Sequence, residues 1–373
     1  MIKVAISLNK CDAAGQKSLV MSYLRNIPRS RISFDLIVDD DSNSIPFEEI
    51  DSLGGRVITI PPYQHILRHM FYLYRLYKKE KYDVLYATNN TMNIFPLFVA
   101  KLTGIKVRIS ESLSTASNYE VKKTIIKSIL RLFSHLFCNY YMANGIKSAE
   151  YQFGKKTTDL GLVSLFYNPI EVEKYCYSPK ERVTTRNKFE WNDKIVYGTI
   201  ARFEKQKNPI FLIDVANEIL KQQENAHFVI IGYGSMEDQM KSKIEQYGIG
   251  KRISWLGKRE DLSLFYNAFD AFILPSLYEG FPIVGLEAQS TGLPSFFSSA
   301  VTREVSVENL SFFIELNKTA KEWADIIING TSNLLKTQRK GRADFLRNNG
   351  FDAKQEASRL VSFFENAVKE RSK

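Results

Sequence analysis

Short apolar segments of strand length alternate with helical patterns along most of this chain, and this alternation constrains its fold more than any other feature. Helical patterns such as residues 16–25, 65–79 and 93–102 separate the strand candidates of the first half, which are residues 3–8, 34–38, 57–60, 84–87, 107–110, 140–143 and 163–166. Such alternation predicts an α/β protein with a parallel sheet covered by helices on both faces. Ligands of such sheets bind at the carboxyl ends of the strands.

The alternation restarts in the second half. A polar stretch at residues 168–193 is typical of an interdomain linker, and a new strand candidate follows at residues 194–201. Later strand candidates at residues 227–231, 252–256 and 271–274 alternate with helical patterns at residues 209–222, 236–247 and 261–267. A chain of 373 residues is long enough for two domains. We therefore expect two Rossmann-like parallel-sheet domains, residues 1–178 and 179–352, facing a cleft where the chemistry takes place.

Charge and composition narrow the class of protein. The net charge of +10 is concentrated in residues 1–180, which contain 24 Lys and Arg against 16 Asp and Glu. This surplus suits an anionic membrane, a nucleic acid or an acidic substrate, and a simple aid to solubility also explains it. Three widely spaced cysteines favour a reducing cytoplasm over a disulfide framework or a metal site. We expect no secretory signal and no transmembrane helix, because the first residues form a strand pattern and no window of about 18 residues is free of charge.

Two helical patterns in the first half combine an apolar stripe with a basic flank. Residues 65–79 contain Arg68, Arg75, Lys78 and Lys79, and residues 121–139 contain Lys122, Lys123, Lys127 and Arg131. A helix that lies on an anionic membrane surface has this pattern. A helix that faces the core and has a solvated basic edge has it too, so both interpretations stay open.

Residues 270–292, DAFILPSLYEGFPIVGLEAQSTG, form the most informative local pattern. An apolar strand ends at Pro275, a polar loop follows with Glu279, and a helix begins near Pro282 and contains Glu287. The unpaired N–H groups at such a helix start bind phosphate, and the two carboxylates can accept hydrogen bonds from hydroxyl groups. For the two Glu residues alone, the favoured explanation is an ordinary surface-loop residue and an ordinary helix residue beside a strand-to-helix turn.

Other candidate residues follow predicted strands. Arg202 and Lys207, in ARFEKQKNP, are suited to a diphosphate whose charge grows as it leaves. Turns containing small residues at Gly15, and at Gly232 and Gly234, allow close approach of backbone to a ligand, although ordinary tight turns also explain them. Lys258 follows the strand candidate at residues 252–256 and is a weaker candidate for contact with a ligand, because a solvated basic side chain is the ordinary explanation.

The motif P-S-L-Y-E-G-F-P-x-x-x-x-E-A resembles the signature of family 4 of the retaining glycosyltransferases, in which two Glu residues are separated by seven others. Within that family, RFEKQKNPIFLID and RNIPRSRISFDLIVD are similar to transferases of capsule and exopolysaccharide synthesis. The resemblance implies a GT-B fold, in which the second domain holds a nucleotide diphosphate sugar and the first domain holds the acceptor. It further implies that residues 353–373 pack back on the first domain. It also implies retention of configuration without a metal ion or other cofactor.

The resemblance also implies roles for individual residues. Arg202 and Lys207 would hold the diphosphate, Glu279 would contact sugar hydroxyls, and Glu287 would contact the ribose. Backbone N–H groups at the start of the helix would meet the diphosphate, in the segment Gly280, Phe281, Pro282, Ile283 and Val284. The first domain departs from the family: Tyr86, Thr88, Asn89 and Asn90 follow a strand after which a histidine is usual, and Ser110–Ser114 stands where a His-Ser-His-Asn run is common. Replacement hydrogen bonds are expected from Ser112, Ser114 and Asn118.

We therefore predict transfer of a sugar, from a UDP-sugar in the first instance, to a polyprenyl-diphosphate-linked glycan at the inner face of the cell membrane. The altered first domain leaves an alternative, a catalytically weak GT-B protein that binds a nucleotide sugar as a regulator or scaffold. An epimerase would be expected to need acid and base side chains in the cleft, and histidine is missing from the predicted positions. A phosphorylase would need a pyridoxal-phosphate lysine motif, which is not found in the sequence. A nucleic-acid binder leaves the two-Glu pattern unexplained, so we expect no nucleic-acid partner.

Overall fold

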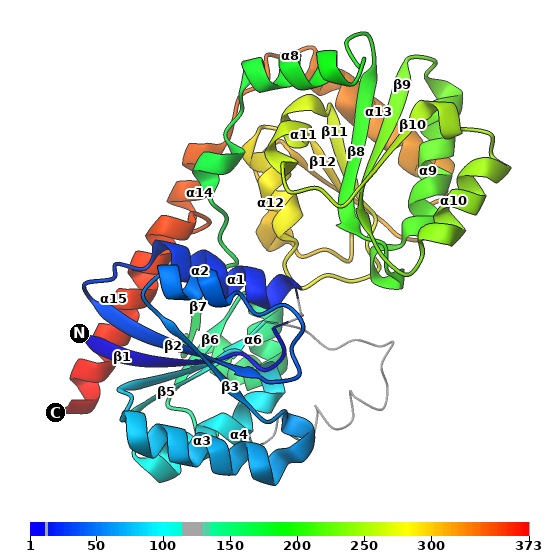
Figure 1. Cartoon of the computed structure of the whole chain (residues 1–373). Coiled ribbons are helices and arrows are strands. Elements are labelled where there is room, and N and C mark those ends of the chain that lie inside the picture. The colour runs from blue at the N-terminus through cyan, green and yellow to red at the C-terminus, as the bar shows by residue number, and fades with distance from the viewer. Residues whose placement is uncertain (12–13, 114–129, 131–132, 134, 373) are drawn as a thin grey trace. The chain divides into compact units, whose positions relative to one another are not determined.

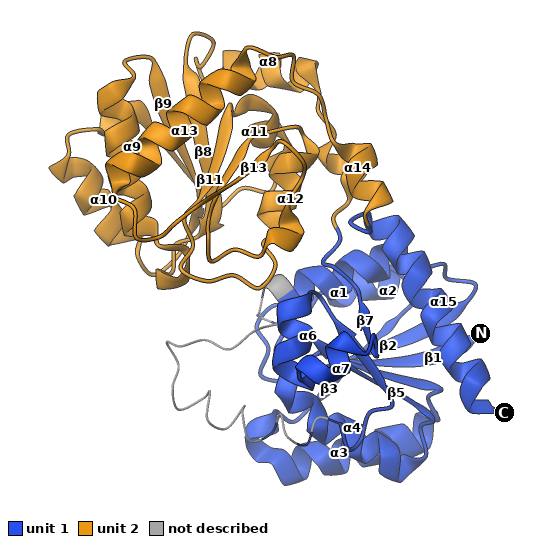
Figure 2. Cartoon of the chain, turned by 180° about the vertical axis from the view of Figure 1, so that it is seen from behind, with its two compact units in different colours: residues 1–169, 350–373 blue, residues 170–349 orange. Residues whose placement is uncertain are grey.

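The chain folds into two α/β units, each built on a parallel sheet (Figures 1 and 2). A computed structural model describes residues 1–11, 14–113, 130, 133 and 135–372. One unit comprises residues 1–169 and 350–373, and the other comprises residues 170–349. The boundaries expected from the sequence lay after residue 178 and before residue 353, so the second unit begins earlier than expected.

In the described part of the first unit, seven parallel strands pair in the order β3-β2-β1-β4-β5-β6-β7. They are β1 (Ile2–Ser7), β2 (Ile32–Asp39), β3 (Arg56–Ile60), β4 (Val84–Ala87), β5 (Val107–Ser112), β6 (Tyr140–Ala143) and β7 (Val163–Leu165). The helices are α1 (Ala14–Asn26), α2 (Phe47–Ser52), η1 (Tyr63–His65), α3 (Ile66–Glu80), η2 (Asn90–Asn93), α4 (Ile94–Thr103), α6 (Ile146–Phe153), α7 (Lys155–Asp159) and α15 (Ala353–Ser372). The predicted helix at residues 121–139 lies largely outside the described residues.

In the described part of the second unit, six parallel strands pair in the order β10-β9-β8-β11-β12-β13. They are β8 (Ile195–Arg202), β9 (Ala226–Tyr233), β10 (Ile253–Gly257), β11 (Ala271–Leu274), β12 (Ser295–Ser298) and β13 (Ser311–Ile314). The helices are η3 (Val172–Tyr175), α8 (Pro179–Lys188), η4 (Lys205–Lys207), α9 (Pro209–Gln222), α10 (Glu237–Gln246), η5 (Gly250–Arg252), α11 (Leu262–Ala268), α12 (Ile283–Ser290), η6 (Arg303–Val305), α13 (Ala320–Leu335) and α14 (Ala343–Asn348).

Both sheets share one topology. Each first strand lies in the middle of its sheet, the next two strands add on one side, and the later strands add on the other. This is the Rossmann strand order, and it creates a switch point where loops on either side of the first strand diverge. The switch points lie between β1 and β4 and between β8 and β11, and ligands of open α/β sheets bind there.

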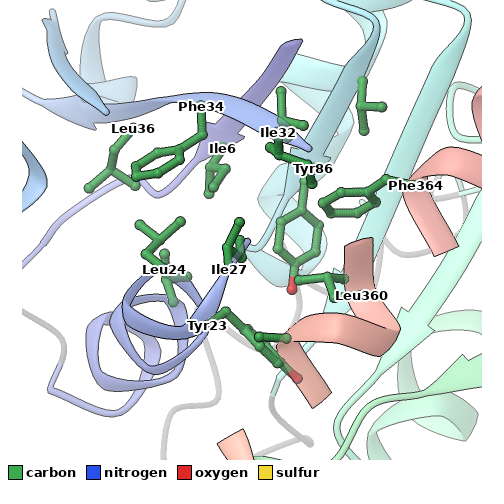
Figure 3. Packing of buried hydrophobic residues seen from close by; sticks show 14 of the residues in the cluster. Ile6, Tyr23, Leu24, Ile27, Ile32, Phe34, Leu36, Tyr86, Leu360 and Phe364 are labelled. Carbon is green, nitrogen blue, oxygen red and sulfur yellow. The ribbon is translucent and has the colours of Figure 1, made fainter. Parts of the chain in front are cut away.

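The C-terminal helix completes the core of the first unit. Figure 3 shows Leu360 and Phe364 of α15 beside Tyr23 of α1 and Tyr86 of β4, with all four side chains buried. Residues four apart lie on the same face of a helix, so α15 presents a continuous apolar stripe to the sheet. Helices α1 and α15 pack together although they lie at opposite ends of the chain.

The predicted linker at residues 168–193 contains the division between the units, after residue 169, but it is not a linker throughout, because α8 lies within it and packs on α11. Its sequence, PKERVTTRNK, has almost no apolar face. Arg182 and Arg186 hold it instead, since both guanidinium groups pair with the buried carboxylate of Asp270 and donate to backbone carbonyl oxygens. Burial of Asp270 is therefore compensated by two cations.

Candidate active site

Two loops meet at the switch point of the second unit. One follows β8 and contains η4, and the other follows β11 and leads into α12. The backbone N–H of Leu277 donates to the carbonyl oxygen of Gln206 at 2.8 Å, and Gln206 Nε2 donates to the carbonyl oxygen of Tyr278 at 3.0 Å. These bonds fix the β8 loop against the β11 loop and bring Lys207 to Glu279.

Glu279 is the centre of a small polar cluster. Its carboxylate, which is mostly buried, pairs with the ammonium of Lys207. Ser276 Oγ donates to Glu279 Oε1 at 2.7 Å, and Gln206 Nε2 donates to Oε2 at 3.4 Å. Ser276 and Gln206 were not predicted from the sequence, although both lie inside the two loops that the sequence singled out. Lys207 and Glu279 therefore form an ion pair, although the sequence predicted a diphosphate contact for Lys207 and a sugar contact for Glu279.

Arg202 is the last residue of β8 and stands beside Tyr233 in the register of β8 and β9. Its side chain is exposed, at the same carboxyl edge as the loop of Glu279. Lys258 follows β10 at this edge and is also exposed, and its Nζ lies 5.8 Å from the ring centroid of Tyr233. An edge with these cations attracts an anionic ligand.

Helix α12 begins at this edge without a capping side chain. Its N-cap is Pro282, and no side chain accepts a hydrogen bond from its first N–H groups. The first N–H groups of a helix have no acceptor within the helix, so those of Ile283 and Val284 are available to an anion. Gly280 and Phe281 lie just before this start, and the side chain of Phe281 is buried.

Glu287 lies in α12 and faces the interior. Tyr266 Oη donates to Glu287 Oε2 at 2.9 Å, and Tyr175 of η3 also hydrogen-bonds this carboxyl. Burial raises the pKa of Glu287, and the bonds from the two tyrosines act in the opposite direction. No local sequence signal identifies these partners, because Tyr175 lies more than a hundred residues before Glu287.

Gly232 and Gly234 are required by the packing of the unit itself. A Cβ atom at Gly232 would lie 1.8 Å from the carbonyl oxygen of Ala201, and one at Gly234 would lie 2.5 Å from that of Phe203. The φ angle of Gly232 is +142°, which L side chains rarely adopt. Close approach to β8 explains these glycines without a ligand.

We expect Gly232→Ala to lower the free energy of unfolding by about 3 kcal/mol, because a backbone clash cannot relax as a flexible side chain does. Gly248→Ala is the matched control, since Gly248 also has positive φ (+66°) but no atom lies within 4 Å of the Cβ that the substitution would add. The control should cost about 1 kcal/mol. Thermal and urea unfolding measure both, and equal losses would contradict the close approach of β8 and β9.

The corresponding edge of the first unit carries a network of carboxamides. Asn89 Nδ2 donates to the backbone carbonyl oxygen of Ser7 at 3.2 Å, and Asn93 Nδ2 donates to Ser110 Oγ at 3.0 Å. Gln16 of α1 donates to the carbonyl oxygen of Thr88 at 2.6 Å. These amides connect the ends of β1, β4 and β5, so the loops that follow the strands are held without histidine.

Several expectations for this edge need correction. Gly15 lies in the first turn of α1 and not in a loop before it. Tyr86 points into the core, where it hydrogen-bonds Glu111. Ser112 Oγ donates to the carbonyl oxygen of Ser148 at 2.9 Å, so its hydroxyl proton is already used. Ser114 and Asn118, proposed replacements for histidine, lie outside the described residues.

Comparison with known proteins shows what the chain is similar to. Residues 181–342 match the family model described as glycosyl transferases group 1. EpsF of Bacillus subtilis strain 168, which is named as a glycosyltransferase, is 25% identical over 366 residues, covering 96% of this chain and 94% of EpsF. The UDP-Gal:alpha-D-GlcNAc-diphosphoundecaprenol alpha-1,3-galactosyltransferase of Escherichia coli is 29% identical over 269 residues, covering 67% of each chain.

Solved structures resemble the whole fold. Anabaena Alr3699/HepE, crystallised in complex with UDP, superposes with a TM-score of 0.80 at 17% identity, covering 98% of this chain and 100% of that one. WaaG, a glycosyltransferase involved in lipopolysaccharide biosynthesis, gives a TM-score of 0.66 at 14% identity, covering 98% of both chains. The predicted GT-B fold is therefore confirmed, whereas the cleft and the roles of the individual site residues stay predictions.

Proposed function

We propose that this chain, a glycosyltransferase whose residues 181–342 match the model of the glycosyl transferases of group 1, transfers a sugar from a UDP-sugar to a lipid-linked glycan with retention of configuration. The observation that supports the donor site is the meeting of the β8 and β11 loops at the switch point. It gathers Lys207, Glu279 and the uncapped start of α12 at an edge that also carries Arg202.

In this proposal the diphosphate of the donor binds between Arg202, Lys207 and the start of α12. Negative charge grows on the diphosphate as the bond to the sugar breaks, so two fixed cations and a row of N–H groups stabilise the transition state more than the ground state. Lys207 is held in place by Glu279 before the donor arrives. These groups supply the positive charge that the step needs, and we propose that no metal ion takes part.

The two carboxylates take different parts of the donor in this proposal. Glu279 has two protein donors besides Lys207, so it is fixed where it can accept hydrogen bonds from hydroxyls of the transferred sugar. Glu287 is fixed by two tyrosines and is proposed to accept from the ribose hydroxyls. Fixed acceptors lose little rotamer entropy when the ligand binds, which favours affinity.

The acceptor class rests on relatives. Besides the galactosyltransferase from Escherichia coli, an undecaprenol-dependent N-acetylgalactosaminyltransferase of Campylobacter jejuni is 26% identical over 329 residues, 82% of each chain. Both names contain a sugar carried on diphosphoundecaprenol or diphospho-undecaprenol. We propose that this chain elongates such a polyprenyl-diphosphate-linked glycan in capsule, exopolysaccharide or O-antigen synthesis.

Saturation-transfer NMR with a panel of UDP- and GDP-sugars tests the donor site, with release of sugar followed in the same samples. We expect one UDP-sugar to bind and to be hydrolysed slowly, and to react faster once a polyprenyl-diphosphate-linked glycan is added. Binding without release or transfer on such acceptors would favour the regulator or scaffold. Failure of every donor to bind would overturn the assignment of the β11 loop and α12.

We further propose that α3 rests on an anionic membrane. Among the described residues, no helix combines the length and apolar content required to cross a bilayer. Helix α3, however, exposes large apolar side chains: Leu67 is 83% exposed, Phe71 56%, Tyr72 44% and Tyr74 42%. Arg68, Arg75, Lys78 and Lys79 are exposed on the same helix, so apolar insertion and attraction to anionic lipid act together.

Replacing Leu67 and Phe71 together by Ala tests this contact. Partial insertion of the two side chains contributes about 2 kcal/mol, so we expect roughly thirty-fold weaker binding to vesicles that contain anionic lipid. Leu160→Ala with Leu162→Ala is the matched control, because these residues of the same unit are 64% and 57% exposed. Sedimentation at two salt concentrations measures binding, and equal losses for both pairs would contradict the role of α3. Tighter binding of RNA or DNA than of vesicles would assign the basic surface to nucleic acid.

A further inference from the structure

A cavity of about 410 Å³ opens at the amino-terminal edge of the first sheet. It is separate from the proposed donor site and from the carboxamide network at the opposite edge of the same sheet. It lies where α3 and α4 end and where β4 and β5 begin. The residues that line it include the apolar Ile105, Val107 and Val368 together with Lys78, Lys81 and Lys106. We call it the lysine cavity.

The lysine cavity has a surplus of positive charge. Within the described part of the chain, none of its three lysines has an ion-pair partner. Its one carboxylate, Asp83, accepts the backbone N–H of Lys3 at 2.8 Å. The neighbouring Glu80 is already paired with Lys3 and Arg56. Lysines also stabilise the carbonyl ends of helices, which explains Lys78 and Lys81 at the end of α3 but does not explain Lys106.

The lysine cavity continues the exposed face of α3. Leu67, Phe71, Tyr74 and Lys78 follow one another at the spacing of a single helical stripe, and Lys78 lines the cavity. A helix of 15 residues is about 22 Å long, so α3 connects the two edges of the sheet. If α3 lies flat on a bilayer, the end of its stripe at Lys78 brings the lysine cavity to the layer of lipid phosphates.

We propose that the lysine cavity binds the phosphate of an anionic phospholipid. The ammonium groups of Lys81 and Lys106 suit a phosphodiester, whereas that of Lys78 lies 6.0 Å from the ring centroid of Tyr74 on α3. The apolar wall suits the glycerol and the first methylenes of the lipid. This inference rests on the membrane contact proposed for α3 and adds a defined headgroup site to it. The bound lipid fixes the C-terminal end of α3. The edge of the sheet that carries the carboxamide network lies toward the N-terminal end of this helix.

The test compares vesicle binding of two variants that lose the same charge. Lys81→Gln with Lys106→Gln removes two cations from the lysine cavity and leaves the exposed stripe of α3 unchanged, although Lys81 is the C-cap of that helix. Lys147→Gln with Lys155→Gln removes two exposed lysines elsewhere in the same unit. The vesicles contain phosphatidylcholine and about 30% phosphatidylglycerol. This composition gives roughly the surface potential of a cytoplasmic leaflet. Thermal unfolding and UDP-sugar binding check that both variants fold.

We expect the cavity variant to bind these vesicles roughly thirty-fold more weakly, the factor for two basic residues at about 1 kcal/mol each, and the control less than three-fold more weakly. A phosphatidylglycerol with a photoreactive headgroup should crosslink to peptides containing Lys81 or Lys106. Equal losses for both variants, or crosslinks elsewhere, would overturn the headgroup site while leaving contact through α3 in place. Absence of vesicle binding by the unaltered protein would overturn both proposals.

Discussion

Arg202→Ala is expected to reduce the turnover number by a factor of about 10² to 10³ while the protein stays folded. Within the described part of the chain, the guanidinium of Arg202 makes no hydrogen bond or ion pair, and its side chain is exposed at the end of β8. Its removal therefore takes nothing from the fold. The loss falls on the step in which the diphosphate leaves, because that is where the charge beside Arg202 increases.

Initial rates with the UDP-sugar and a polyprenyl-diphosphate-linked acceptor measure this effect, and thermal unfolding checks the fold. Lys205→Ala is the matched control, since Lys205 is an exposed cation in η4 of the same loop. We expect the control to keep at least half of the activity. Full turnover in the Arg202 variant would remove Arg202 from the donor site and would require another cation at this edge.

Most of both sheets could be predicted from the sequence, because most of their strands contain a short apolar run. Val84–Ala87, Tyr140–Ala143 and Ala271–Leu274 were predicted with the bounds that the structure gives. Short apolar runs between helical patterns are specific for buried parallel strands. Residues 298–352 received no assignment, although Thr319 and Glu322 form a capping box at the start of α13. That signal is local and was available in the sequence.

Helix α8 could not be found by periodicity, because its stability does not come from an apolar face. Arg182 and Arg186 hold it through Asp270, which lies more than eighty residues further along the chain. The periodicity of apolar residues indicates which side chains are buried, and it does not reveal a helix that is held by ion pairs. A polar stretch therefore resembled a linker while it was a packed element.

In the candidate site too, some features could be predicted from the sequence and others could not. Arg202, Lys207, Glu279 and Glu287 could be selected because each lies in a short motif after a strand or at a helix start. Their partners could not, because contacts such as Tyr266 with Glu287 are made by the tertiary fold. Pairing of Lys207 with Glu279 spans 72 residues, and no local pattern encodes it. Local sequence thus identifies chemical groups, whereas the fold decides which of them act as a unit.

The pairing of Lys207 with Glu279 gives the second large prediction. The side chain of Lys207 is 15% exposed and that of Glu279 is 6% exposed, so removal of the ammonium leaves a buried carboxylate without its cation. Lys207→Ala should therefore lower the free energy of unfolding by about 2–4 kcal/mol. It should also reduce turnover by about 10² to 10³, since one of the two cations on the leaving diphosphate is lost.

The double variant Lys207→Ala with Glu279→Gln separates these two effects. A neutral amide does not need a counter-charge, so we expect most of the lost stability to return, while turnover stays at or below that of Lys207→Ala. Urea unfolding measures the first quantity, and initial rates with donor and lipid-linked acceptor measure the second. If activity returned together with stability, Lys207 would be a structural partner of Glu279 only, and stabilisation of the leaving diphosphate would fall to Arg202 and the start of α12.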